Sequence, residues 1–199
     1  MRPNRRSLAK YLGICLSALV LSVSGFSLMI RIPLRQLVHM SEAIVIGKVQ
    51  SIRCEWSLDK RLILSIVKVR IQEEIRGELW GPDIVLEVPG GTMGGLSLKV
   101  TDMPTFHEQE EILIFLRAIK NAADTRHSFS VAQNFFPSFE VCGKAQGKYA
   151  IDAGGLARAS EYETYTEEED SGAALPLASL KAQIQSILRE ARTKKQRDR

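Results

Sequence analysis

The chain has 199 residues, which is the length of one domain with extensions at its ends rather than of two full domains. Charged residues make up 25% and hydrophobic residues 45%, an ordinary globular composition that excludes collagen-like, low-complexity and wholly disordered chains. The formal net charge of +4 comes from the two ends, since residues 1–24 carry four basic residues and no acid and residues 181–199 carry seven basic and two acidic residues, so it is no evidence of a nucleic-acid-binding fold.

The first predicted element is an export signal. A basic segment over residues 2–10 precedes residues 11–30, which contain no charged residue. Small residues ahead of Gly25 suit cleavage by signal peptidase, so residues 1–24 are predicted to be a signal peptide. The alternative is an uncleaved signal anchor that extends to residue 30, because an apolar helix of this length could span a bilayer. Cleavage would leave the rest of the chain outside the cytoplasm, periplasmic or secreted. The alternative is a chain anchored in the membrane by residues 11–30, and the sequence does not give the side of the membrane on which the rest would lie.

The route of export stays open. Arg5 and Arg6, followed by Leu8 and Lys10, resemble a twin-arginine signal, although paired arginines also occur in ordinary signals. Cys15 follows a weak lipobox-like sequence, in which Ile14 is bulky where a small residue is needed.

Residues 31–153 are predicted to form a mainly β domain. After a short helix within residues 32–40, alternating or continuous apolar segments follow one another, joined by turns that contain Gly or Pro. No helical pattern separates them, so a small antiparallel barrel or sandwich is favoured over a parallel sheet. The alternation changes phase at Ile66/Val67, which predicts a β-bulge. The predicted strands cover residues 43–54, 62–75, 84–88, 96–100, 111–116, 129–131, 139–141 and 148–151.

The C-terminal part is predicted to contain an acidic linker over residues 154–175, an amphipathic helix over residues 176–192 and a frayed basic tail over residues 193–199. Leu180 and Ile184 belong to one apolar stripe of this helix. The stripe is expected to pack over an open barrel end or a sheet edge. The alternative is contact of the helix and its basic tail with an anionic membrane.

Cys54 and Cys142 are the two cysteines that would remain after signal cleavage. Export favours oxidation, so a disulfide between them is a candidate, and it would close a loop of about 90 residues. Two buried free thiols are the alternative.

A glycine-rich segment follows the strand predicted at residues 84–88. It lacks the Gly-Lys-Ser/Thr ending and the following helix of a phosphate-binding loop, so a flexible hairpin connection is predicted. Because rigid β scaffolds present function on loops, the segment is also the candidate binding loop. Its residues are Gly90, Gly91, Thr92, Met93, Gly94 and Gly95.

The sequence predicts no catalytic, metal or cofactor site. His39, His107 and His127 lack partners at metal-ligand spacing, and the acidic stretch of residues 161–170 lacks the spacing of a calcium loop. No Gly-x-Ser-x-Gly elbow is present. We therefore predict a protein that is not an enzyme, with a hydrolase site assembled from distant residues as a remaining hypothesis.

Residues 41–151 contain an ordered set of short segments: Ser41-Glu42-Ala43-Ile44-Val45-Ile46-Gly47-Lys48-Val49, Ile75-Arg76-Gly77, Val88-Pro89-Gly90-Gly91, Pro104-Thr105-Phe106 with Glu110, Leu113-Ile114-Phe115-Leu116, and Gly147-Lys148. This set resembles a group of uncharacterised exported bacterial β-domain proteins. The same layout is similar to the OB-like barrel of netrin-module and tissue-inhibitor-of-metalloproteinase domains. The resemblance implies an OB-like barrel rather than an activity, because those inhibitors use an N-terminal cysteine where this chain would begin at Gly25.

The function predicted from these observations is that of a non-catalytic exported binding or interaction module of the bacterial cell envelope. Its expected partner is an unidentified protein or envelope component and not a nucleic acid, and membrane contact is expected only through an uncleaved anchor. The alternative, which depends on the netrin-module resemblance, is an inhibitor or modulator of an extracytoplasmic enzyme.

Overall fold

The computed structural model describes residues 31–57, 59–79, 81–119, 138–160 and 174–197. The predicted signal peptide or anchor, the predicted strand at residues 129–131 and the acidic stretch lie outside these residues. In the described ranges, no helix has the length and hydropathy that a membrane crossing requires. The elements are α2 (Leu34–Met40), β1 (Ala43–Trp56), β2 (Ile63–Arg76), β3 (Asp83–Pro89), β4 (Gly91–Met93), β5 (Leu96–Leu98), β6 (Glu111–Ala118), β7 (Ser138–Val141), the 3-10 helix η2 (Lys144–Gly147), β8 (Lys148–Ile151), β9 (Leu156–Ala159), β10 (Leu175–Pro176) and α3 (Leu177–Arg197).

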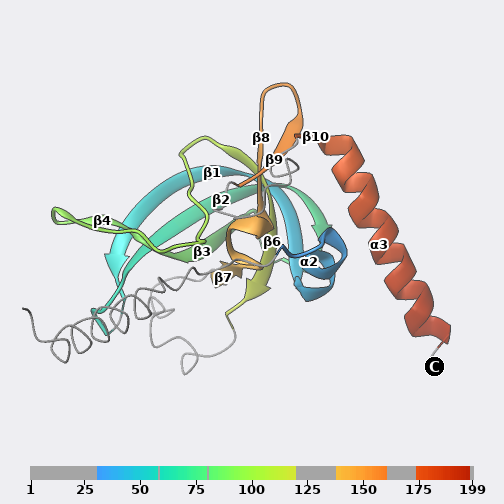
Figure 1. The fold of residues 1–199 in the computed structure, drawn as a ribbon, viewed down its shortest axis with the longest axis horizontal. Helices are drawn as coiled ribbons and strands as arrows, with labels where there is room; N and C mark the ends of the chain where they lie inside the picture. The colour runs from blue at the N-terminus through green and yellow to red at the C-terminus, as the bar shows by residue number, and fades with distance from the viewer. Residues whose placement is uncertain (1–30, 58, 80, 120–137, 161–173, 198–199) are drawn as a thin grey trace, which may run out of the picture.

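Five strands close into a barrel, in the order β1-β2-β3-β7-β6 and back to β1 (Figure 1). Four of the five pairings are antiparallel, and the pairing of β3 with β7, which places Val85 opposite Ser138, is parallel. A ring with an odd number of strands cannot alternate direction at every pairing. The prediction of a mainly β barrel is confirmed, but the prediction of an antiparallel one is wrong at this single pairing.

The two long strands β1 and β2 form most of the barrel wall. Register shifts between them lie at Ile44/Val45, Ile46/Gly47 and Val49/Ser51. The bulge predicted at Ile66/Val67 is wrong, because these two residues pair in continuous register with Arg53 and Ile52. The change of phase in the sequence has another cause, which is that both faces of β2 are buried: Val67 belongs to the barrel core, and Ile66 belongs to a separate cluster with Leu64 and Val85.

Alternate residues of the strands fill the barrel interior, as the pleat of a β-strand requires. The loop that follows the β4–β5 hairpin packs Met103 and Phe106 against this interior core. The barrel therefore contains a packed core, as small barrels generally do. The buried core residues are Ala43, Val45, Val49, Val67, Val69, Ile84, Leu86, Val88, Ile112, Ile114, Leu116 and Phe139.

A second core lies on the outer face of β1 and β6, beneath the two α-helices. Ile44 of β1 and Phe115 of β6 point outward to meet Leu37 of α2 and Leu180 and Ile184 of α3. The apolar stripe predicted for the C-terminal helix is confirmed. It covers an outer face of the barrel, whereas a barrel end or sheet edge was expected.

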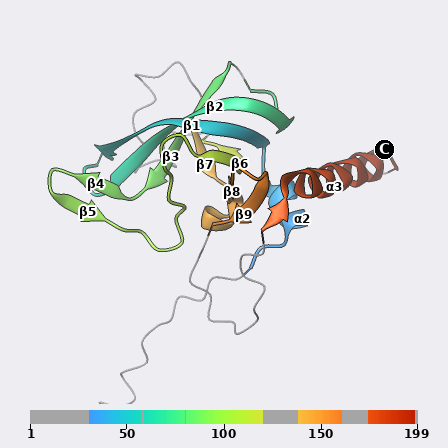
Figure 2. The same ribbon diagram turned by 90° about the horizontal axis from the view of Figure 1, so that it is seen from above.

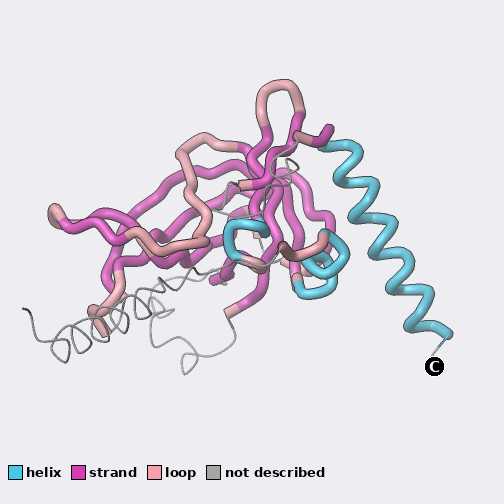
Figure 3. The backbone as a smooth tube through the Cα atoms, in the orientation of Figure 1, coloured by secondary structure: helices cyan, strands magenta, loops and turns pink. Residues whose placement is uncertain are grey.

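The C-terminal boundaries differ from the predicted ones. β9 and the first residue of β10 lie in the segment predicted to be a linker over residues 154–175, and α3 continues past residue 192 to Arg197. β9 is too short to show a clear alternation, and it depends on a turn in which Asp152 Oδ1 accepts hydrogen bonds from the amides of Gly154 and Leu156, each at 2.9 Å. Figure 3 shows β8, β9 and β10 extending the sheet away from the barrel toward the start of α3.

Candidate functional site

The β4–β5 hairpin projects from one end of the molecule (Figures 1 and 2). Met93 pairs with Leu96, and between them Gly94 and Gly95 have φ angles of 58° and 80°. Positive φ at both central residues is the type I′ turn of two-residue hairpins, which glycine adopts without steric cost. The hairpin predicted from the glycine-rich segment is therefore confirmed.

The base of the hairpin is fixed to the barrel wall. The amide of Gly90 donates to the carbonyl of Ile63 at 2.8 Å, and Ser65 Oγ donates to the carbonyl of Gly90 at 2.7 Å. Gly91, with φ of 138°, lies so close to the wall that a Cβ there would come within 2.6 Å of the Cys54 Sγ atom. Glycine is thus required where the chain turns away from β3.

The tip of the hairpin is open to solvent. Leu96 is 58% exposed, the most of any large hydrophobic side chain in the part of the chain that the structure describes. A Cβ added at Gly94 or Gly95 would meet nothing within 4 Å. Because β4 and β5 form a sheet of only two strands, an extended partner segment could add to it and bury Leu96.

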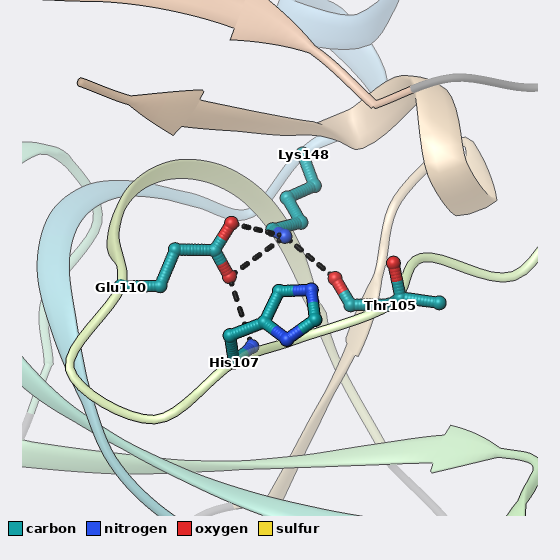
Figure 4. A network of polar contacts seen from close by, with 4 residues as sticks. All are labelled: Thr105, His107, Glu110 and Lys148. Atoms are coloured by element: carbon teal, nitrogen blue, oxygen red, sulfur yellow. Dashed lines mark hydrogen bonds and ion pairs between the residues drawn. The ribbon is translucent and has the colours of Figure 1, made fainter.

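A buried polar cluster lies at the start of β8 (Figure 4). Lys148 is 3% exposed, and its ammonium group donates to both carboxylate oxygens of Glu110, at 2.7 and 2.9 Å, and to the carbonyl of Thr105 at 2.5 Å. The Nζ atom also lies 4.8 Å from the centre of the Phe106 ring. Burial lowers the pKa of Lys148, and the neighbouring Glu110 carboxylate opposes that shift without cancelling it.

This cluster holds a loop in place. Glu110 also accepts a hydrogen bond from the backbone amide of His107 at 3.1 Å, so the loop from Thr105 to Glu110 is tied to β8 through one lysine. Phe106, in the same loop, packs on the barrel core. A protonated amine with three acceptors is suited to a structural role, because it has no lone pair to offer as a nucleophile.

A second buried carboxylate lies at the start of β3. Asp83 is 5% exposed and forms ion pairs with Arg70 and, at 3.1 Å, with Lys68, both on the adjacent strand β2. Burial alone would raise the pKa of Asp83, but the hydrogen bonds and charges of Arg70 and Lys68 together hold it below its ordinary value. The cluster fixes the edge where β2 and β3 begin to pair.

Cys54 and Cys142 are free thiols, so the candidate disulfide is not formed in the structure. Cys54 lies beside Ser65, with 3.8 Å between Sγ and Oγ, whereas Cys142 lies in the second core with Ile44. Ile44 precedes Cys54 by ten positions on β1, about 33 Å of extended strand, so the curved wall keeps the two thiols apart. Burial raises the pKa of the Cys142 thiol, and the hydroxyl of Ser41 and the charge of Arg117 oppose it.

His39 and His107, the two histidines that the structure describes, do not belong to a metal-binding group. Among the described residues, no three His, Cys, Asp or Glu side chains gather closely enough to hold a metal ion. His39 is exposed in the last turn of α2, His107 lies in the loop before β6, and His127 lies outside the described residues.

The pairing of Glu110 with Lys148 was not predicted from the sequence. One signal was available: a lysine opens the otherwise uncharged strand β8. Both residues also belong to the segments that carry the family resemblance.

Comparison of the chain with family models and with curated proteins found no match.

Proposed function

We propose that this chain is a non-catalytic binding module of the bacterial cell envelope and that the β4–β5 hairpin is its contact element. The observation that carries the proposal is the combination of a fixed base and an open tip. Gly90 and Gly91 hold the base against Ser65, while Leu96 stands in solvent at the tip. An exposed apolar side chain on a preorganised strand pair loses little conformational entropy on binding, which favours recognition.

We also propose that the barrel is OB-like. The ring of five strands supports this proposal. In it, β1 pairs with both β2 and β6, and the parallel pair β3–β7 closes the ring. OB-like barrels bind their ligands on outer strands and loops. The apolar core fills the interior here, and Phe106 and Lys148 secure the adjacent loop, so a partner is expected on the outside.

The proposed location is outside the cytoplasm, with residues 1–24 removed as a signal peptide or residues 11–30 retained as an anchor. The test is the intact mass of the protein isolated from cells. A mass that begins at Gly25 supports a released periplasmic or secreted protein, and a full-length mass in the membrane fraction supports an anchor. A full-length mass in the cytoplasmic fraction would contradict export.

Binding through the hairpin is tested by photo-crosslinking in intact cells. A photoreactive amino acid replaces Leu96 in the full chain, and the matched control places it at Leu156, an exposed leucine of β9. The proposal predicts a discrete crosslinked product from position 96 and none of that mass from position 156. Identical products from both positions, or none from position 96, would refute the hairpin as the contact element.

A further inference from the structure

The helix α3 has two parts with different surroundings. Leu180, Ile184 and Ile187 are buried in the second core. From Leu188 to Gln196, no described side chain of α3 is buried. Figures 1 and 2 show that this last part extends beyond the barrel, at the end of the molecule opposite the hairpin.

The extending part of α3 is strongly basic. The only acid in it, Glu190, forms an ion pair of 2.8 Å with Arg35 of α2, so its charge is balanced by a residue outside the helix. Arg189, Arg192 and Lys194 are exposed to solvent. Placing positive charge at a helix C-terminus is favourable, but the helix dipole acts only on the last turn. The basic residues of this part are Arg189, Arg192, Lys194, Lys195 and Arg197.

We propose that this basic end of α3 binds the anionic headgroups of a lipid bilayer. Clusters of four to eight basic residues on an amphipathic helix are a chemical pattern of anionic lipid recognition. The ion pair of Arg35 with Glu190 shows that the basic end of α3 lies beside the first turn of α2. α2 begins four positions after residue 30, the end of the predicted export segment, so the chain enters the domain next to this charge.

The contact is electrostatic and does not insert into the bilayer. An amphipathic helix that lies in a membrane uses its apolar face for insertion. In α3 that face is already packed on the barrel through Leu180 and Ile184. Binding therefore depends on charge and weakens at high salt, because the screening length falls from about 10 Å at roughly 0.1 M salt to about 3 Å at roughly 1 M.

The binding orients the molecule. Because the hairpin and the basic end of α3 lie at opposite ends of the molecule, attachment through α3 presents the hairpin away from the lipid surface (Figure 2). The choice of lipid as the anion rests on the proposed export. The proposal is otherwise independent of hairpin binding, and either can fail alone.

The test is trypsin cleavage of the full chain, mixed with vesicles of phosphatidylcholine alone or of phosphatidylcholine with an equal amount of phosphatidylglycerol. Cleavage after Lys194 is compared with cleavage after Lys60, an exposed site in the β1–β2 turn. Each basic residue near an anionic surface strengthens binding about fivefold. Phosphatidylglycerol is therefore expected to slow cleavage after Lys194 at least about tenfold relative to cleavage after Lys60, and high salt to restore it.

Two variants make the test specific. Arg189→Gln with Arg192→Gln is expected to abolish the protection of Lys194. Arg53→Gln with Lys99→Gln, two exposed basic residues outside α3, is expected to leave it intact. Equal cleavage in both kinds of vesicle, or equal loss of protection in both variants, would overturn the proposal. Protection by a soluble polyanion such as heparin without protection by phosphatidylglycerol vesicles would overturn it in favour of a different anionic partner. An unchanged crosslink at position 96 shows that hairpin binding stands regardless.

Discussion

At the scale of single residues, the fold depends on charged side chains that are buried and paired. Lys148 and Glu110 are both largely buried, with side-chain exposures of 4% and 15%. Removing each of these charges from water costs several kcal/mol of desolvation free energy. A well-formed ion pair offsets that cost. The lysine also holds Thr105, so the pair determines where the loop lies.

Replacing Lys148 alone is expected to be strongly destabilising. Lys148→Met leaves the Glu110 carboxylate buried without its cation, and the free energy of unfolding in urea should fall by about 3–5 kcal/mol. The double variant Lys148→Met with Glu110→Leu removes both charges and should recover most of that loss. A double variant no more stable than the single one would show that the two residues are not energetically coupled.

Asp83 makes the stability of the fold depend on pH in the acidic range. Its pKa in the folded chain lies below the ordinary value of 3.8, so its stabilisation is present above pH 3.8 and is lost as the pH falls through the folded pKa. Asp83→Asn should lower the free energy of unfolding at neutral pH by about 1 kcal/mol, since Lys68 and Arg70 are partly exposed. The difference from the natural chain should shrink below pH 3.8 in a urea titration. A difference that is constant with pH would contradict this account.

At the scale of elements, the spacing of apolar residues predicted helices and strands that the packing confirms. The apolar stripe of α3 follows from the spacing of Leu180, Ile184 and Ile187, and β6 follows from its continuous apolar run. β9 and β10 could not be predicted, because each is short and depends on pairing with a neighbour already in place. The register shifts between β1 and β2 were not predicted either. The shift at Ile46/Gly47 lies where Gly47 closely approaches the carbonyl of Arg70, a contact that leaves no mark in the order of apolar residues.

The docking of α3 is tested by Ile184→Asp, which places a charge in the second core, where Ile184 is fully buried. The free energy of unfolding should fall by roughly 3–5 kcal/mol, as for other buried apolar residues whose packing is lost. The matched control, Gln183→Asp, changes an exposed neighbour on the same helix and should have an effect within about 0.5 kcal/mol. Similar losses in both variants would mean that the effect comes from helix propensity rather than docking.

At the scale of the whole molecule, the sequence was sufficient to predict a small barrel, but not to predict which strands pair to close it. Turn residues and alternation predicted the strands, whereas the parallel pairing of β3 and β7 is a consequence of closing a ring of five. The separation of Cys54 from Cys142 likewise follows from the path of β1 around the barrel. The hairpin could be predicted because its glycines act locally, through the turn at Gly94 and Gly95.

The free thiols lead to a prediction about the molecule in oxidising buffer. The Tm of the chain should be the same with and without a reductant, and alkylation of the native protein should modify Cys54 before Cys142, which is 2% exposed. A Tm that drops on reduction, with neither thiol modified beforehand, would show that the two cysteines are bonded.

The measurement that tests the central claim most directly combines the crosslink at position 96 with a change in the turn. Gly94→Val with Gly95→Val forces β-branched residues into positive φ and should disrupt the hairpin, while the barrel, which neither position contacts, keeps its Tm. We expect the crosslinked product to disappear with Tm unchanged. A crosslinked product that persists at full yield in this variant would contradict the hairpin as the binding element.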